Sequence, residues 1–97
     1  MAQIIWNKRA SKQFEELQKY LQEEFGLKAA ETFTTRTFKF LELLLQYPQI
    51  GSIENKQKEI RGFLLHQHTT IFYKERHSNI YILALFDNRQ SSGKRKI

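Results

Sequence analysis

The side chains of this sequence that could take part in chemistry are imidazoles and cations in its second half. Histidine is the side chain suited to proton transfer near neutral pH, and the i, i+2 spacing of His66 and His68 would place both on one face of a strand. Lys56, Lys58 and Arg61 form a basic approach to that strand and could steady a phosphate. The two histidines have no nearby third residue of the type that a zinc site needs, so we expect no metal. They remain candidates for proton transfer, with polar residues at a strand end as the alternative.

A second group of cations lies at the C-terminus, within a basic tail of residues 88–97. The tail cations are Arg89, Lys94, Arg95 and Lys96. No acidic residue lies among residues 89–97, and the whole chain has a net charge of +6. This charge is typical of a protein that faces nucleic acid, a nucleoprotein surface or an acidic protein. A tail that only improves solubility is the alternative interpretation.

Two further polar side chains are candidates because a strand could hold them in a fixed direction. Arg89 lies just after the last predicted strand, where it could contact a partner or pair with Asp87 or Glu59. Tyr73 lies at the end of a predicted strand, and its hydroxyl could reach a ligand or could complete the packing of the core.

The length and composition exclude several classes of protein. Ninety-seven residues with 40% hydrophobic content predict a single folded domain over residues 1–97. The absence of cysteine excludes disulfides, thiolate metal sites and a cysteine nucleophile. The sequence has no membrane-length apolar run, signal peptide or Gly-rich phosphate loop. We therefore expect a cytoplasmic protein without membrane contact, nucleotide cofactor or metal.

The first half of the chain predicts a strand followed by two helices. Residues 3–6 form a short run that is rich in β-branched and aromatic side chains, Asn7 suits a helix N-cap, and Gly26 suits the residue that ends a helix. The first helix carries an apolar stripe of Ala10, Phe14, Leu17, Leu21 and Phe25. The second carries Ala30, Phe33, Thr37, Leu41 and Leu44, and Pro48 ends it. The short link predicts an antiparallel helical hairpin, with Trp6 in the core or as a cap over it.

The second half predicts three strands. We expect strands at residues 60–65, 69–74 and 80–86, with a hairpin connection over residues 75–79. The continuously apolar residues 80–86 predict a central strand that is covered on both faces. The order β-α-α-β-β-β is typical of an α+β domain, in which the hairpin packs on one face of a mostly antiparallel sheet.

The order of these motifs resembles the RelE/ParE toxin superfamily of bacterial type II toxin–antitoxin modules, often labelled plasmid-stabilisation proteins. The motifs are a strand ending in Trp6, a Pro-x-x-Gly turn in residues 47–51, Ile60-Arg61, Ile71-Phe72-Tyr73, and an apolar strand closing in Asp87-Asn88-Arg89-Gln90. The resemblance covers nearly the whole chain. It implies the same α+β fold and a basic toxin that a cognate antitoxin neutralises in a heterocomplex.

Two mechanisms occur in the superfamily that the chain resembles. RelE-like members cut mRNA in the ribosomal A site without a metal, and ParE-like members poison DNA gyrase. The RelE-like set includes a strand arginine, but a rough alignment places Thr69-Thr70 at that position. It also includes a C-terminal aromatic residue or histidine, but neither follows Phe86. These departures favour the ParE-like branch, in which the domain binds its target instead of catalysing a reaction.

We therefore predict a toxin that inhibits growth by binding gyrase. A ribosome-dependent endoribonuclease, and a non-toxic member that only binds its antitoxin, are the alternatives. The expected target contacts are Arg89, Gln90, Lys94, Arg95, Lys96, Lys56 and Lys58. If the chain is a nuclease, the catalytic candidates are Arg61, His66, His68, Tyr73 and Arg89. The antitoxin would lie on surplus apolar area beside the stripe of the second helix, at Phe38 and Leu45.

Overall fold

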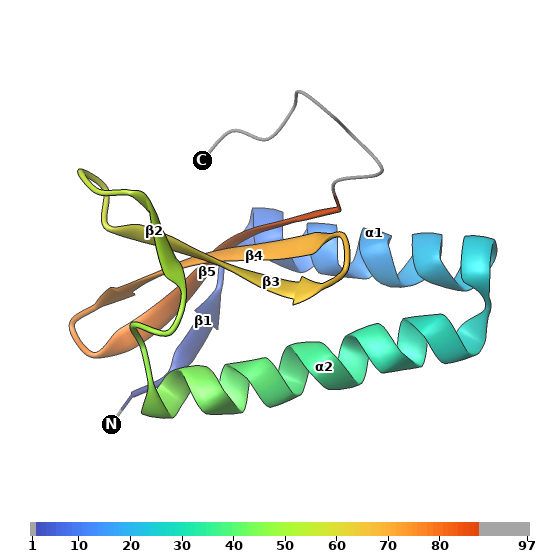
Figure 1. Ribbon diagram of the computed structural model, residues 1–97, viewed down its shortest axis with the longest axis horizontal. Coiled ribbons are helices and arrows are strands. Elements are labelled where there is room, and N and C mark those ends of the chain that lie inside the picture. The colour runs from blue at the N-terminus through green and yellow to red at the C-terminus, as the bar shows by residue number, and fades with distance from the viewer. Residues whose placement is uncertain (1, 88–97) are drawn as a thin grey trace.

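The computed structural model describes residues 2–87, which form two helices and one sheet (Figure 1). In chain order the elements are β1 (Ile4–Trp6), α1 (Lys8–Phe25), α2 (Leu27–Gln46), β2 (Ser52–Asn55), β3 (Ile60–His66), β4 (Thr69–Arg76) and β5 (Asn79–Asp87). The strand order across the sheet is β1-β5-β4-β3-β2, with only β1 parallel to its neighbour. The predicted α+β class is confirmed, and β2 is an additional strand that the sequence did not predict.

The helical hairpin begins and ends at the predicted residues. The Asn7 side-chain oxygen accepts a hydrogen bond from the Ala10 backbone N–H at 2.7 Å, which satisfies one of the free donors of the first turn. Gly26 separates the two helices with a φ of 97°, a conformation that side-chain-bearing residues rarely adopt. Between the helices, Gln18 Nε2 donates to Thr34 Oγ1 at 2.8 Å. The two helices therefore turn back on each other as expected.

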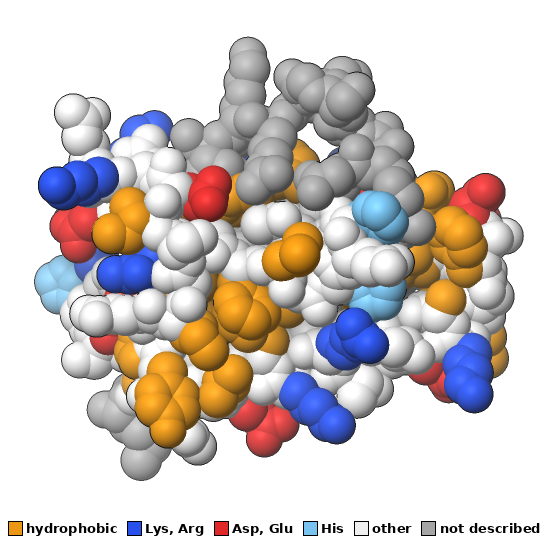
Figure 2. All heavy atoms as spheres, viewed as in Figure 1, with side chains coloured by type: hydrophobic (Ala, Val, Ile, Leu, Met, Phe, Trp, Pro, Cys, Tyr) orange, Lys and Arg blue, Asp and Glu red, His pale blue; other side chains and the backbone are white. Residues whose placement is uncertain are grey.

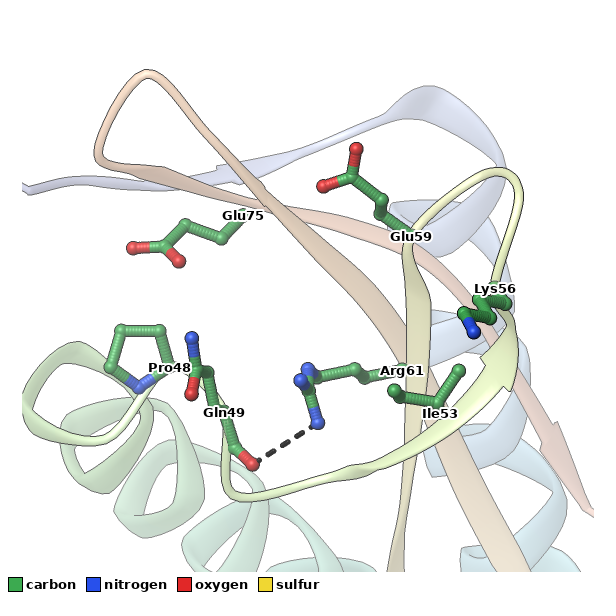
Figure 3. Close-up of a pocket in the computed structure, with 7 residues that line it drawn as sticks. All are labelled: Pro48, Gln49, Ile53, Lys56, Glu59, Arg61 and Glu75. Atoms are coloured by element: carbon green, nitrogen blue, oxygen red, sulfur yellow. Dashed lines mark hydrogen bonds between the residues drawn. The ribbon is translucent and has the colours of Figure 1, made fainter.

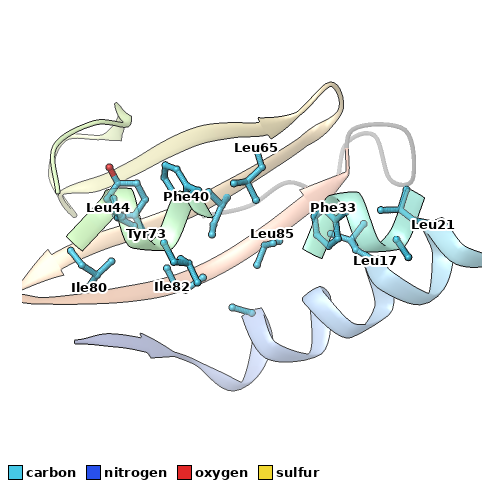
Figure 4. Packing of buried hydrophobic residues seen from close by; sticks show 14 residues of the cluster. Leu17, Leu21, Phe33, Phe40, Leu44, Leu65, Tyr73, Ile80, Ile82 and Leu85 are labelled. Carbon is cyan, nitrogen blue, oxygen red and sulfur yellow. The ribbon is translucent and has the colours of Figure 1, made fainter. Parts of the chain in front are cut away.

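The main core lies between the helical hairpin and one face of the sheet (Figure 4). Most predicted stripe residues are buried there, including Leu41, and Trp6 packs against Phe14 with ring centroids 5.2 Å apart. Phe40 was not predicted, yet it is buried and stacks on Phe63 at 4.2 Å. Phe25, which was predicted on the stripe, is exposed. A smaller cluster covers the other face of the sheet, centred on Ile60, Phe72 and Ala84.

Residues 80–86 lie within β5, which pairs with β1 on one side and with β4 on the other, so the predicted strand is an inner strand of the sheet, but its coverage on the second face is only partial. The middle strand of the sheet is β4, which is buried continuously from Thr69 to Tyr73. Along β5, buried residues mostly alternate with half-buried ones. Phe72 pairs with Ala84 but Tyr73 pairs with Ile82, so Leu83 is an extra residue in a β-bulge. The run is continuously apolar because both faces of β5 pack against apolar residues: one face belongs to the main core, and Leu83, Ala84 and Phe86 belong to or pack against the smaller cluster.

The hairpin between β4 and β5 is tighter than predicted. Its loop is only His77 and Ser78, with φ values of 53° and 68°, and the strands extend to Arg76 and from Asn79. Positive φ at both loop residues is the geometry that matches the natural twist of paired strands. No helix within residues 2–87 is both long enough and apolar enough to cross a lipid bilayer.

Candidate functional site

The site is built around Tyr73, which lies inside β4 and points toward the loop that follows α2. The Tyr73 hydroxyl donates to the Pro48 carbonyl oxygen at 2.9 Å and accepts from the Gly51 backbone N–H at 2.8 Å. The side chain is fully buried. One hydroxyl therefore ties the middle strand of the sheet to both ends of the Pro-x-x-Gly turn.

The protonation of Tyr73 follows from this environment. Burial raises the pKa of the Tyr73 hydroxyl above its ordinary value, while the hydrogen bond from Gly51 and the charge of Arg61 oppose that rise. Tyr73 does not end its strand as predicted, because β4 continues to Arg76. A buried, protonated hydroxyl that already has two backbone partners is poorly suited to exchange a proton with a substrate.

Gly51 is required at its position because the sheet approaches it closely. A Cβ atom at Gly51 would lie 2.8 Å from the Gly62 carbonyl oxygen and 2.8 Å from the Tyr73 hydroxyl. Real Cβ atoms do not come this close to backbone oxygen, so any larger residue would push the loop away from Tyr73. The glycine of the Pro-x-x-Gly turn is therefore explained by the lack of space for a side chain, in addition to the preference of turns for glycine.

Arg61 holds the same loop from the next strand. It lies opposite Tyr73 in the pairing of β3 with β4. Its Nη1 donates to the Gly51 carbonyl oxygen at 2.7 Å and to the Gln49 carbonyl oxygen at 3.3 Å. The predicted catalytic candidates Arg61 and Tyr73 are thus brought together, but their contacts are with the backbone of the loop.

A pocket of about 230 Å³ opens beside the Arg61 guanidinium (Figure 3). Its lining residues are Pro48, Gln49, Ile53, Lys56, Glu59, Arg61 and Glu75. The pocket therefore combines two cations and two carboxylates with apolar walls from Pro48 and Ile53. Neither carboxylate forms an ion pair with Arg61. Ile53 and Glu75 are lining residues that the sequence patterns did not single out.

The two predicted lysines lie in the tight turn between β2 and β3. The turn is closed by Asn55, whose side-chain oxygen accepts the Lys58 backbone N–H at 2.9 Å. Both lysine side chains are exposed, and Lys56 lines the pocket while Lys58 does not. The expected basic approach to β3 is therefore an exposed hairpin tip beside the pocket.

The two histidines lie at the other end of β3, so the structure does not bring them to Arg61. His66 is the last residue of β3, but His68 lies in the two-residue turn before β4. The prediction that both histidines share one face of a strand is therefore wrong. Arg61 and His66 are separated by roughly 16 Å, at about 3.3 Å per strand residue. Within residues 2–87, no three His, Asp or Glu side chains lie close enough together to hold a metal ion.

The threonines at the position of the expected strand arginine are Thr69 and Thr70, and both are buried. They pair with Asp87 and Phe86 on β5, so this position is closed to a ligand of phosphate size. The position at which the RelE-like pattern has an arginine is therefore occupied in this chain by buried threonines.

The tail residues on which the sequence prediction depends lie outside the described part of the chain. These residues are Arg89, Gln90, Lys94, Arg95 and Lys96. The charge itself is a property of the sequence. Residues 1–87 hold twelve Lys and Arg against ten Asp and Glu, and the other four cations all lie at residues 88–97. Most of the net charge of +6 therefore belongs to the tail.

Exposed apolar side chains gather over the C-terminal end of α2 (Figure 2). Phe38 and Leu45 are exposed, as expected from their place beside the stripe. Tyr47 is 58% exposed, and Ile50 is exposed in the loop that Tyr73 holds. A shallow hollow of about 620 Å³ in this region shares Pro48, Gln49 and Glu75 with the pocket beside Arg61. The sequence patterns missed Tyr47 and Ile50 as surface residues, because they follow the helix instead of continuing its stripe.

A family model described as "ParE toxin of type II toxin-antitoxin system, parDE" matches residues 4–91. No relative was found among the curated proteins compared by sequence.

Solved structures of low sequence identity share the fold. A structure described as the chromosomal ParDE TA system from P. aeruginosa aligns with a TM-score of 0.74 and 15% identity, over 90% of this chain and 96% of that chain. A YoeB/ParE toxin from Agrobacterium tumefaciens aligns with a TM-score of 0.63 and 7% identity, over 88% and 97%. A conserved hypothetical protein from Helicobacter pylori aligns with a TM-score of 0.51 and 18% identity, over 92% and 97%.

Proposed function

This chain belongs to the ParE toxin family of type II toxin–antitoxin systems, and we propose that it inhibits growth by binding DNA gyrase. The family makes it the toxin of a pair, with an antitoxin as partner. The family alone does not say what the toxin acts on. We favour binding of gyrase over cleavage of RNA because of the chemistry of the described residues.

The observation that carries the proposal is the state of the Tyr73 hydroxyl. Cleavage of RNA without a metal needs a base, an acid and cations around one phosphate. The hydroxyl beside Arg61 is buried and bonded to Pro48 and Gly51, and the histidines lie at the far end of β3. Among residues 2–87, the proton-transfer groups next to Arg61 other than this hydroxyl are Lys56 and the two carboxylates of its pocket. The described residues therefore favour a binding protein.

The residues expected to contact the target are Arg89, Gln90, Lys94, Arg95 and Lys96 of the tail, together with Lys56 and Lys58. Gln90 is the one uncharged member of this set. The tail follows β5 directly, and the four tail cations supply most of the net charge. An acidic surface on a protein target would attract this segment over a distance of about one Debye length.

We place the antitoxin on the exposed apolar residues of α2, chiefly Phe38 and Leu45. Phe38 is 50% exposed, although its ring also meets Phe14 edge-on at 5.9 Å. An amphipathic segment laid along α2 would bury both side chains, which is the usual mode of helix-in-groove recognition. Since Phe38 and Leu45 are seven residues apart, they lie on one side of the helix.

The target is tested by inducing the chain in cells that lack its antitoxin. Plasmid supercoiling and the 5′ ends of mRNA are then measured in the same culture. We expect growth arrest, blocked supercoiling and intact messages. Codon-phased cuts in the messages would instead identify a ribosome-dependent endoribonuclease, and normal growth would identify a non-toxic member that only binds an antitoxin.

The role of the tail is tested by Arg89→Ala. We expect the growth arrest to disappear while the free energy of unfolding changes by no more than about 0.5 kcal/mol, the usual range for a substitution that removes a target contact and no packing. Arg76→Ala removes an exposed cation from the end of β4 and is the matched control. Equal toxicity of Arg89→Ala and Arg76→Ala would contradict the proposed contact.

A further inference from the structure

The Arg61 guanidinium is fixed by one of its nitrogens, which leaves an edge of the group available. Nη1 donates to the carbonyl oxygens of Gly51 and Gln49, at 2.7 and 3.3 Å. Both bonds come from Nη1. Within residues 2–87 the side chain makes no further hydrogen bond or ion pair. The N–H groups on Nε and Nη2 therefore remain, side by side, as a pair of parallel donors.

A pair of parallel N–H donors is the arrangement that binds a carboxylate through both of its oxygens. Arginine normally loses side-chain freedom when it binds an anion, which weakens the complex. Here the two carbonyl oxygens already hold the half-buried guanidinium, so most of that freedom is lost in folding. The group is thus organised for a ligand before the ligand arrives.

We propose that the pocket beside Arg61 binds one aspartate or glutamate side chain of a partner protein. The proposal rests on the proposed function, in which the chain acts by binding proteins. Lys56 supplies a second positive charge at the pocket wall, and the volume of about 230 Å³ suits a single side chain. Pro48 and Ile53 provide apolar contact for the methylene groups of that side chain, and Ile53 is 58% exposed.

The carboxylates of Glu59 and Glu75 distinguish this ligand from a nucleic acid. Both line the same pocket, and their charge opposes a strand that carries a phosphate at every nucleotide. A peptide can carry a single carboxylate between neutral or basic residues. That carboxylate can bind Arg61, and no further negative charge of the peptide then lies next to Glu59 or Glu75. The mixed lining therefore favours a protein ligand.

The surface next to the pocket indicates which kind of residue lies beside the acidic residue in the partner segment. Pro48, Gln49 and Glu75 also line the hollow that contains Tyr47 and Ile50. A bound segment that enters the pocket would pass over these two exposed apolar residues. We therefore expect the partner segment to combine the acidic side chain with an apolar one nearby.

The proposal is tested by NMR on the whole chain, following the Nε–H signal of Arg61. The probes are acetyl-glutamate amide, acetyl-glutamine amide, inorganic phosphate and a short oligouridylate, each titrated separately. We expect acetyl-glutamate amide to shift the signal saturably and to bind at least about tenfold more tightly than acetyl-glutamine amide, a ratio that corresponds to about 1.4 kcal/mol. The measurement uses the unaltered protein, so it does not depend on how a variant folds.

Two variants separate the guanidinium from the charge. Arg61→Lys keeps the positive charge but removes the parallel donors, so acetyl-glutamate amide should lose most of its binding as followed by the backbone amides around the pocket. Arg76→Gln, which removes an exposed cation outside the pocket, should bind the probe as the unaltered protein does. Backbone spectra show whether each variant keeps the fold.

The possible results separate this proposal from the proposed function. An Arg61 signal that does not move, or that moves equally with acetyl-glutamine amide, overturns the carboxylate pocket and leaves the gyrase assay to decide the function. Tighter binding of phosphate or oligouridylate than of acetyl-glutamate amide also overturns it. If that result accompanied cut messages in cells, the proposed function would fail as well.

Discussion

Replacing Tyr73 with phenylalanine removes a single oxygen from the contact that joins β4 to the loop after α2. The aromatic ring stays in the core, where it meets Phe40 edge-on with centroids 6.2 Å apart. The variant therefore keeps the apolar packing and loses only the two hydrogen bonds to Pro48 and Gly51. Any change in stability reports on those bonds.

The size of the change follows from where each partner lies. The Gly51 N–H is buried, and a buried donor without a partner costs about 1–3 kcal/mol. Pro48 is half-buried, so water can replace part of its bond and the loss there is at most about 1 kcal/mol. We expect the free energy of unfolding to fall by about 2–3 kcal/mol. For a domain of this length, each kcal/mol lowers Tm by roughly 4–8 °C.

Urea unfolding measures this change directly. The midpoint should move to lower urea while the slope m stays constant, since the buried surface is almost unchanged. Tyr81→Phe is the matched control, because Tyr81 is a half-buried tyrosine on β5 that has no hydrogen bond from its hydroxyl within residues 2–87. A loss below about 0.5 kcal/mol for Tyr73→Phe, equal to that of the control, would refute the reasoning that the hydroxyl holds the loop.

The same variant gives a dependence on pH whose sign follows from the raised pKa of Tyr73. In the unfolded chain a tyrosine loses its proton near pH 10, whereas burial keeps the Tyr73 proton bound to a higher pH in the folded chain. The folded state then binds more protons, so the stability due to this group is complete below about pH 10 and declines as the pH rises further. The stability difference between the unaltered protein and Tyr73→Phe should therefore narrow above about pH 10, and a constant difference up to pH ~11 would contradict the raised pKa.

Two further changes test the packing around the site. Gly51→Ala should destabilise the fold by about 1–3 kcal/mol in urea unfolding, because its Cβ would lie 2.8 Å from the Gly62 carbonyl oxygen and must displace the loop; unchanged stability would show that the loop moves freely. Leu41→Ala should cost about 2–5 kcal/mol by the same measurement, because Leu41 is buried in the main core. A loss below about 1 kcal/mol there would place Leu41 on the surface.

The sequence predicted the helical half of the protein well because its signals are local. An N-cap acts on backbone groups two or three residues away, and a glycine or proline acts on its own backbone conformation. Asn7, Gly26 and Pro48 therefore marked the helix ends without any knowledge of the rest of the fold. The order of the motifs was enough to indicate the family, which the match over residues 4–91 confirms.

The sheet was predicted less well because strands depend on partners that are distant in the sequence. β2 has little apolar alternation of its own and is mostly exposed, yet it forms because β3 pairs with it. β5 has apolar residues on both faces, so its sequence does not show that β4, rather than β5, lies in the middle of the sheet. Neither feature has a signal within the strand itself.

The roles of the polar residues near the site were decided by the tertiary structure alone. The sequence alone shows that Arg61, Tyr73 and the two histidines lie within residues 61–73. Side chains of these types could transfer protons or bind an anion. The sheet register places Tyr73 opposite Arg61 and beside Gly51, which is 22 residues away in the sequence. His66 ends β3 and His68 lies in the turn that follows, so both histidines are at the end of β3 away from Arg61. Hydrogen-bond partners at that separation depend on how the strands pair, and so only the folded chain shows that the tyrosine and the arginine hold a loop.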